Sequence, residues 1–332
     1  MKPALRSIGI HLITLVIIGG YSYCQFNQMS KEWPIAYDEV RYFINTDYFD
    51  FFRNGDWKNQ SWQSLDAYDQ PPLYKYFFGM ILLPNYQRAA RTRDKILYDN
   101  DRFDLEMFFG KSQENDIVPY VVLARRFAVL SALLTLALVY GIIHSLHGNV
   151  LISALSVLLL GSTPVFTGSL LYAKPENLYV PLLLVSYFLG IYAFLKRSLL
   201  LIALSAFIGG LSVAAKLTGL LYFLTAPLFL ALSFYKNTNN SKFFFAALML
   251  VYCIGFAGWY LFNPTLYPNP IVNSIRYVST RQETIQFQSG QEGNRYLLMS
   301  DTRVRLGNLR CVFIGSDTSG CVSGKMFLPS FF

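Results

Sequence analysis

Charged residues are scarce in this chain of 332 residues. They make up 14% of the sequence, whereas an average soluble domain carries about a quarter, and 53% of the residues are hydrophobic. This imbalance predicts a membrane protein. Acidic residues are scarcer still in the apolar part, where Glu176 is the one acid between residues 117 and 282. An isolated acid in such a stretch usually has a specific role.

Cysteine, histidine and the common catalytic motifs are also sparse. Four cysteines are too few for a disulfide scaffold, none has metal-ligand spacing, and Cys311 and Cys321 could pair only in an oxidising compartment. The sequence contains no G-x-x-x-x-G-K-[ST], H-E-x-x-H or G-x-S-x-G motif, which argues against a P-loop nucleotide site, a zinc protease and an α/β-hydrolase. The three histidines, His11, His144 and His147, fall in a predicted span or on its cytoplasmic side, so histidine catalysis is not expected.

Basic residues outnumber acidic ones, and the formal net charge is +8. They are scattered along the chain, without the basic stripe interleaved with aromatic residues that nucleic-acid binding would need. Basic residues that flank membrane spans explain the charge better. We therefore expect a lipid bilayer, and no nucleic acid, as a partner.

Long apolar runs determine the predicted fold class. A hydrocarbon core about 30 Å thick requires about 20 apolar residues per helix. Single spans are predicted near residues 8–24, 121–143, 150–167, 177–195 and 243–262, and the run 198–235 is long enough for two. We therefore predict an all-α polytopic membrane protein with about seven transmembrane helices. The first run could instead be a cleaved signal peptide, but no small-x-small cleavage site follows it.

The orientation of the spans follows from Lys and Arg, which stay on the cytoplasmic side. Lys2 places the N-terminus inside, so residues 25–120 form a large external loop. Lys196 and Lys236 are also best placed inside, so the run between them must contain two short helices with a tight reversal near "AAKLTG". The last span then delivers residues 266–332 to the outside.

The stretch "PPLYKYFFGMILLP" at 71–84 is apolar and aromatic, but at a helical rise of 1.5 Å per residue it spans only about 21 Å. It is too short to cross a membrane. Its opening Pro-Pro suits a helix start, and we interpret it as an amphipathic helix lying on the outer leaflet. The basic cluster "QRAARTRDK" that follows would then be external, which long loops tolerate.

This topology gathers the conspicuous polar residues on the external side. They are Asp38 and Glu39 in the stretch "AYDEV", Lys75, Arg125, Arg126, Glu176 and Lys216. Ionisable groups in or at the edge of spans usually line a polar cavity or pathway. Simpler interpretations stay open: a solvated Asp-Glu pair, arginines that anchor a helix end by snorkelling, a solvated Lys174–Glu176 pair, and a lysine that only marks a turn.

Acids beside cations at the outer leaflet suit a reaction on a lipid-linked phosphate. The basic groups would hold the phosphate and stabilise the charge that builds on it as a leaving group. A carboxylate would take the proton from an incoming hydroxyl. An adjacent Asp-Glu pair could also hold a divalent metal ion, with Glu176 as a candidate for a further oxygen ligand, and the residues leave open whether a metal is needed.

Several stretches, in order, resemble the GT-C class of multispan glycosyltransferases, in the branch of protein O-mannosyltransferases and lipid A aminoarabinose transferases. "YDEVRYF" is similar to the acidic motif of the family's first external loop, and "DQPPLYKYFFGM" is similar to its His-Pro-Pro-Leu-x-Lys surface helix, with Gln70 in place of the His. "STPVFTGSLLYAKPE" resembles the Ser/Thr-Pro segment and its following acid, with Glu176 in place of Asp. "GGLSVAAKLTG" resembles the Gly-x-x-x-x-x-Lys-x-x-Gly hairpin, and "FNPTLYPNPI" the Asn-Pro segment after a later span.

The resemblance implies a GT-C-like transmembrane module over residues 1–265 and a short external segment at 266–332 that is truncated relative to the family. It also implies an inverting sugar transfer from a polyprenyl- or dolichyl-phosphate donor. In that reaction Asp38 would be the general base or the acid that orients the acceptor, with Glu39 beside it. The substrate-binding residues would be Lys75, Arg125 or Arg126, and Lys216, which hold the lipid phosphate, together with Glu176.

We therefore predict a multi-pass membrane glycosyltransferase of the cell envelope, transferring a hexosyl or pentosyl group on the external face of the plasma (inner) membrane if the source is prokaryotic. The acceptor would be a hydroxyl or phosphate on a protein, lipid or glycan. The alternative is a non-catalytic or truncated membrane subunit, or a transporter-like protein, that binds a lipid phosphate without chemistry. Asp38, Arg125, Glu176 and Lys216 are expected to line one outward-facing cavity.

Overall fold

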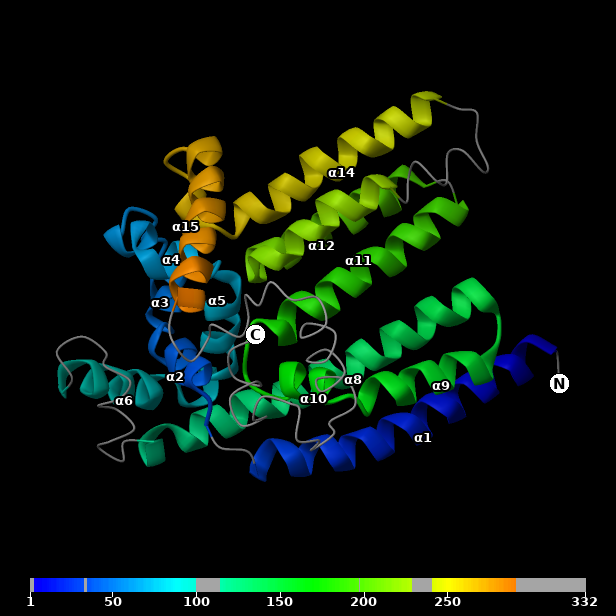
Figure 1. Ribbon diagram of the computed structural model, residues 1–332, viewed down its shortest axis with the longest axis horizontal. Helices are drawn as coiled ribbons and strands as arrows, with labels where there is room; N and C mark the ends of the chain where they lie inside the picture. Colours follow the sequence, from blue (N-terminus) through cyan, green and yellow to red (C-terminus); the bar gives the residue numbers. More distant parts are fainter. Residues whose placement is uncertain (1–2, 33–34, 100–113, 197, 229–240, 291–332) are drawn as a thin grey trace. The chain divides into compact units, whose positions relative to one another are not determined.

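The computed structural model describes the whole chain except residues 1–2, 33–34, 100–113, 197, 229–240 and 291–332. Every regular element of the described part is a helix, and that part contains no strand (Figure 1). The predicted all-α fold class is therefore confirmed. The candidate pair Cys311–Cys321 lies outside the described residues.

The described residues form two compact units, each built from separate stretches of the chain. Unit 1 takes in the described residues of Met1–Arg41, Thr92–Lys174 and Arg281–Phe332, and unit 2 consists of Tyr42–Arg91 and Pro175–Thr280. The division into a module at 1–265 and an external segment at 266–332 stays a prediction. Three helices run across the boundaries of these stretches: α2 (Tyr37–Ile44), α6 (Tyr86–Asp99) and α15 (Pro270–Gly290).

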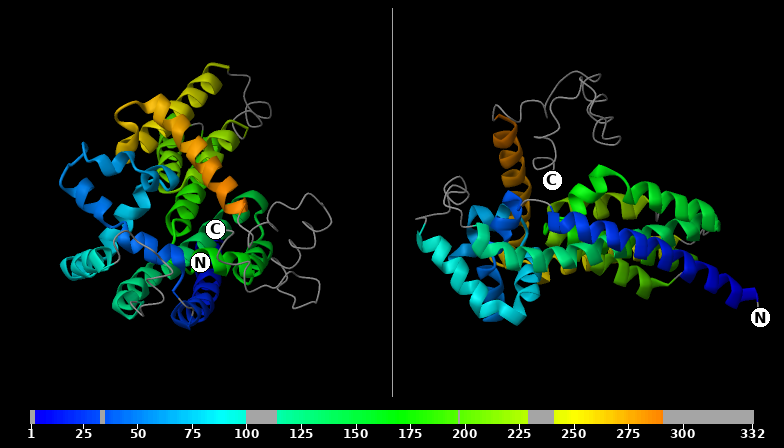
Figure 2. Two further views of the ribbon diagram at one scale, coloured as in Figure 1. Left: turned by 60° about the vertical axis from the view of Figure 1, so that its left-hand side comes forward. Right: turned by 90° about the horizontal axis from the view of Figure 1, so that it is seen from below.

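Unit 1 is built on two long apolar helices and two shorter ones. These are α1 (Pro3–Glu32), α8 (Glu114–His147), α9 (Val150–Gly161) and α10 (Pro164–Leu170). α8 packs against both α1 and α9, and Figure 2 shows the group from two further sides, with α1 in blue. His11 on α1 lies 2.8 Å from the hydroxyl of Tyr140 on α8, measured from its Nδ1. The histidine is thus part of the packing between these two helices.

The turn between α8 and α9 has a clear local cause. Gly148 has a φ of +67°, a backbone conformation that glycine adopts without the steric cost other residues meet. The side chain of Asn149 then caps α9 by accepting hydrogen bonds from the amides of Leu151 and Ile152. The stretch "HGN" therefore ends one long helix and starts the next.

Three described helices are long and apolar enough to cross a membrane: Asp116–His147 in α8, Glu176–Ala193 in α11 (Glu176–Lys196) and Lys242–Leu261 in α14 (Ser241–Leu261). α9 and α10 make a fourth if the pair, bent by 68°, is one span. The bend follows from Thr163, which caps α10, and from the proline at the start of that helix. These helices coincide with four of the predicted spans. The first predicted span lies within α1, and the total of seven stays a prediction.

Unit 2 contains the predicted reversal near "AAKLTG". α12 (Leu199–Ala215) ends at Lys216, whose backbone is extended, and an apolar helix over Leu217–Leu228 follows. The second helix runs back along the first. This is shown by the hydroxyl of Tyr222, which lies 3.4 Å from Oγ of Ser205 on α12. Gly219 allows this close return, since a Cβ there would lie 2.6 Å from the backbone of Ser212. Two short helices joined by a tight turn are thus what the structure shows.

Close packing of α12 against α14 depends on glycine. A Cβ at Gly210 would lie 1.9 Å from the carbonyl oxygen of Gly255, and a Cβ at Gly258 would lie 2.4 Å from that of Phe207. Such contacts bring two helix backbones together, as small residues do in membrane helix pairs. The exposed large side chains of α14 include Phe245, Met249, Tyr252 and Phe256, which are spaced by three or four residues on one apolar face.

The segment 71–84 forms a shorter helix than its sequence suggests. α5 covers only Leu73–Ile81, which corresponds to about 14 Å, and it cannot span a membrane. It contacts both α3 (Asp47–Arg53) and α12, and most of its side chains are buried. A Cβ at Gly79 would lie 2.5 Å from Phe49, which shows how closely α3 approaches. α5 is therefore mainly an interior helix of unit 2, and its position on an outer leaflet stays a prediction.

We predict that Gly210→Ala lowers the thermal stability of the detergent-solubilised protein, because the added methyl group overlaps the Gly255 carbonyl and must push α12 and α14 apart. The expected cost is about 1 to 3 kcal/mol, measured by thermal unfolding. Gly20→Ala on α1 is the matched control, since nothing lies within 4 Å of a Cβ there. Equal melting temperatures for the two variants would contradict the proposed helix contact.

The predicted orientation can be tested by cysteine labelling. In a chain whose native cysteines are replaced by serine, a membrane-impermeant maleimide should label Asp56→Cys in intact cells. It should label Lys196→Cys only after permeabilisation, because that residue is predicted to face the cytoplasm. Both positions are exposed in the structure, so access from the aqueous side is expected. Labelling of Lys196→Cys in intact cells would reject the orientation.

Candidate functional site

The Asp-Glu pair begins α2. Asp38 and Glu39 lie in the first turn of this helix, where negative charge interacts favourably with the helix dipole. Glu39 also reaches back, and its Oε2 accepts a hydrogen bond of 2.9 Å from the backbone N–H of Ala36. This is the glutamate half of a capping box, which satisfies an amide that the helix leaves without an internal partner.

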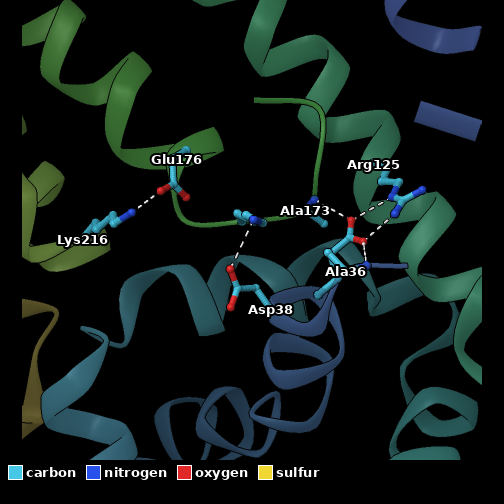
Figure 3. Close-up of polar contacts among 8 residues, drawn as sticks. Ala36, Asp38, Arg125, Ala173, Glu176 and Lys216 are labelled. Carbon is cyan, nitrogen blue, oxygen red and sulfur yellow. Dashed lines mark hydrogen bonds and ion pairs between the residues drawn. The ribbon is translucent and has the colours of Figure 1, made fainter. Parts of the chain in front are cut away.

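Glu39 is fully buried and bound by Arg125 of α8 (Figure 3). Nε of the arginine donates to Oε1 over 2.8 Å and Nη2 donates to Oε2 over 2.5 Å, which is the two-pronged geometry that guanidinium and carboxylate groups favour. Nη1 donates to the carbonyl oxygen of Ser30 near the end of α1, and the amide of Ala173 donates to Oε1 over 2.8 Å. Glu39 therefore accepts four hydrogen bonds, and the pair that it forms with Arg125 links α1, α2, α8 and the segment after α10.

Asp38 points to a different partner. Its Oδ2 lies 3.3 Å from Nζ of Lys174, and the side chain of the aspartate is 32% exposed while that of the lysine is 1% exposed. The ring of Tyr172 lies 5.1 Å from both the Arg125 guanidinium and the Lys174 ammonium. Burial and the charge of Glu39 raise the pKa of Tyr172, although Arg125 opposes the shift, so the phenol stays neutral at physiological pH. Of the two adjacent acids, Asp38 is the one with access to solvent.

A second ion pair lies in unit 2. Glu176, in the first turn of α11, accepts a hydrogen bond through Oε1 from Lys216 at the end of α12, and the lysine lies 5.8 Å from the ring of Tyr179. The other oxygen, Oε2, is buried and has no hydrogen-bond partner among the described residues. A buried carboxylate oxygen in this state usually implies a water or ligand that completes its bonding. Glu176 is buried, so the alternative of a solvated Lys174–Glu176 pair is wrong.

The remaining predicted site residues differ in their surroundings. Lys75 is completely buried in unit 2, where Nζ donates to the carbonyl oxygen of Asp66 over 2.7 Å and lies 4.0 Å above the ring of Tyr48. Arg126 is exposed on α8. A phosphate-binding role would require Lys75 to exchange its carbonyl for the ligand, whereas Arg126 is accessible as it stands.

The structure thus brings some of the predicted residues together within each unit. In unit 1 it joins Glu39 to Arg125, and in unit 2 it joins Glu176 to Lys216. The single cavity expected for these residues draws on both units and stays a prediction.

The sequence pattern pairs Lys174 with the nearby Glu176, whereas in the structure Lys174 lies beside Asp38. The sequence does hold a signal for such a pair, because a lysine in so apolar a segment needs an acid close to it in space. It does not say which acid, since Asp38 is 136 positions away in the chain.

No cluster of three or more His, Cys, Asp or Glu side chains that could hold a metal ion occurs in the described part of the chain. No protein-family model matches the sequence, and no curated protein matches it. The contacts within each unit therefore carry the functional argument.

We predict that Glu39→Gln strongly destabilises the protein, because it leaves the buried Arg125 charge without its counter-ion. Breaking such a pair typically costs about 3 to 5 kcal/mol, measured here by thermal or denaturant unfolding in detergent. Arg126→Gln is the control on the neighbouring, exposed arginine and should change stability by less than about 0.5 kcal/mol. Similar stabilities for the two variants would show that the Glu39–Arg125 pair is not structural.

Proposed function

We propose that the protein is a membrane glycosyltransferase that moves a sugar from a polyprenyl- or dolichyl-phosphate to an acceptor on the external face of the membrane. The observation that carries the proposal is the contrast between two adjacent acids. Glu39 accepts four hydrogen bonds, whereas Asp38 lies 3.3 Å from Lys174 and keeps a side chain that is about one third exposed. A general base needs this combination of a fixed position and access to its substrate.

The proposed reaction is a single displacement. The acceptor's oxygen attacks the anomeric carbon, and its proton passes to the Asp38 carboxylate. The bond between that carbon and the phosphate oxygen breaks, and the bonding electrons leave with the polyprenyl phosphate. The configuration at the sugar carbon is inverted because attack and departure occur on opposite faces.

The apolar helices support a lipid-linked donor. α8, α11 and α14 are long and apolar enough to cross a bilayer, so a substrate with a polyprenyl chain can reach the protein from the membrane. The sequence resemblance assigns the phosphate to basic side chains, and we select Arg126 and Lys216 from them because part of each side chain is exposed. Arg126 is exposed, and the Lys216 side chain is 12% exposed. Arg125 already donates from all three of its nitrogens within unit 1, so we assign it to holding Glu39 in place.

The proposal is tested by turnover of a defined donor. Purified protein, given a panel of polyprenyl-phosphate hexoses and pentoses with a hydroxyl acceptor, should release polyprenyl phosphate from at least one of them, detected by chromatography. Asp38→Asn should reduce that release by about 100-fold or more, the range usual for loss of a general base, while donor binding is retained. Asp116→Asn, at an exposed acid of α8, should leave the rate unchanged.

The outcomes separate the alternatives. Full turnover in Asp38→Asn would reject this residue as the base. Binding of the donor without release of polyprenyl phosphate in the native protein would favour a non-catalytic subunit that recognises lipid phosphate.

A further inference from the structure

The first half of α15, residues 270–280, packs on the rest of unit 2 through one side of the helix. Asn273 and Tyr277, four residues apart on that side, are both buried. Nδ2 of Asn273 donates to the carbonyl oxygen of Thr265 over 2.7 Å. The Tyr277 hydroxyl donates to Oδ1 of Asn263 over 2.9 Å. These two hydrogen bonds fix the rotation of the helix about its own axis.

The opposite side of this half-helix is aliphatic and exposed. The side chains on it are between 50% and 73% exposed and belong to Ile271, Val272, Ile275 and Val278. At about 100° per residue they fall within one sector of the helix about 120° wide, opposite the buried side. A helix at the surface of a water-soluble domain buries its apolar face and exposes its polar one. Here the hydrogen-bonding side chains hold the helix to the protein, and the aliphatic ones point away from it.

α15 is not a further membrane span. Its 21 residues include the charges of Arg276, Arg281 and Glu283, and it is not among the described helices that are long and apolar enough to cross a bilayer. It follows α14, which is among them, after the short linker 262–269. Residues 270–280 run across the direction of α12 and α14 and not along it, as Figure 1 and the right-hand view of Figure 2 show. A helix that runs across a membrane-crossing helix lies along the membrane surface.

The junction between α14 and α15 carries side chains of the kind that gather at a membrane interface. Tyr260, in the last turn of α14, and Tyr267, in the linker, are both partly exposed, and their ring centroids are 5.0 Å apart. The Tyr267 hydroxyl donates to the carbonyl oxygen of Leu261 over 2.8 Å, at the end of the candidate span. Tyrosine is enriched where a helix leaves the hydrocarbon core, because its ring is apolar and its hydroxyl reaches water. If α14 crosses the bilayer, α15 begins close to the lipid headgroups.

We propose that the first half of α15 lies in the interface of the bilayer that α14 crosses, with its four exposed aliphatic side chains inserted among the lipid acyl chains. Amphipathic helices bind membranes in this way, with the apolar face about 5 to 10 Å into the boundary between headgroups and acyl chains. Arg276, at the edge of the aliphatic face, is exposed and can bind a headgroup phosphate.

A lipid surface fits this face better than a protein surface does. The aliphatic side chains extend over about two helical turns, whereas a stable protein–protein interface takes about 20 to 30 residues a side. The sequence predicts a surface helix at 71–84, but most side chains of α5 are buried in unit 2, whereas α15 presents an exposed apolar face. The inference goes beyond the proposed function and does not depend on sugar transfer.

The test measures the depth of α15 in the full chain with a fluorophore. Ile275→Cys and Val278→Cys, in protein whose native cysteines are replaced by serine, are labelled with an NBD fluorophore and reconstituted into vesicles of phosphatidylcholine and phosphatidylglycerol. Phosphatidylcholine with a nitroxide on its acyl chain should lower the emission of both labels, and iodide on both sides of the membrane should lower it little. Met249→Cys on α14 is the control for a label in the hydrocarbon core, and the exposed Asp56→Cys is the control for a label in water.

Each contrary result has a distinct meaning. If iodide quenches the α15 labels as strongly as the Asp56→Cys label, the aliphatic face lies in water and the proposal is wrong. Protection from both quenchers would also overturn it, because a protein surface must then cover the face, and an oxidative disulfide between two Ile275→Cys chains would identify a second copy. If the nitroxide lipid does not quench the Met249→Cys label, α14 is outside the bilayer and the proposal fails with it. None of these results depends on release of polyprenyl phosphate, so this inference and the proposed function can fail separately.

Discussion

The buried ion pair between Glu39 and Arg125 is the interaction on which unit 1 depends. Two charges without water are stable only if each finds several partners, and here the carboxylate accepts four hydrogen bonds while the guanidinium donates three. These bonds reach α1, α2, α8 and the segment after α10. A pair with so many attachments fixes the orientation of the first turn of α2, and with it the direction of Asp38.

This arrangement gives the two adjacent acids, Asp38 and Glu39, different roles. Glu39 is committed to structure, because every oxygen already has its partners and no water reaches it. Asp38 lies at the edge of the same cluster, beside Lys174, and its side chain is 32% exposed. Neighbouring residues on a helix point in directions about 100° apart, so one can face the interior while the other faces outward. The geometry therefore supports Asp38, and not Glu39, as the group that exchanges a proton.

Unit 2 is held together by different means. Its apolar helices gain little from hydrophobic burial if lipid surrounds them, so close backbone packing becomes more important. Gly210, Gly255 and Gly258 let α12 and α14 touch, and Gly219 lets the chain fold back after Lys216. The same fold-back brings Lys216 to Glu176, so the second ion pair depends on glycine positions that carry no chemistry themselves.

The sequence alone was sufficient to predict the helical class, four of the apolar helices and the reversal at Lys216, because these depend on local composition and on the length a bilayer requires. It also identified Asp38, Glu39, Arg125, Glu176 and Lys216 as charges that an apolar chain would not carry without reason. It could not pair them. Whether Arg125 meets Glu39 or a ligand, and whether Lys174 meets Asp38 or solvent, depends on contacts between residues 86 and 136 positions apart. Only the tertiary structure decides such pairs, since no local pattern records which distant segments pack together.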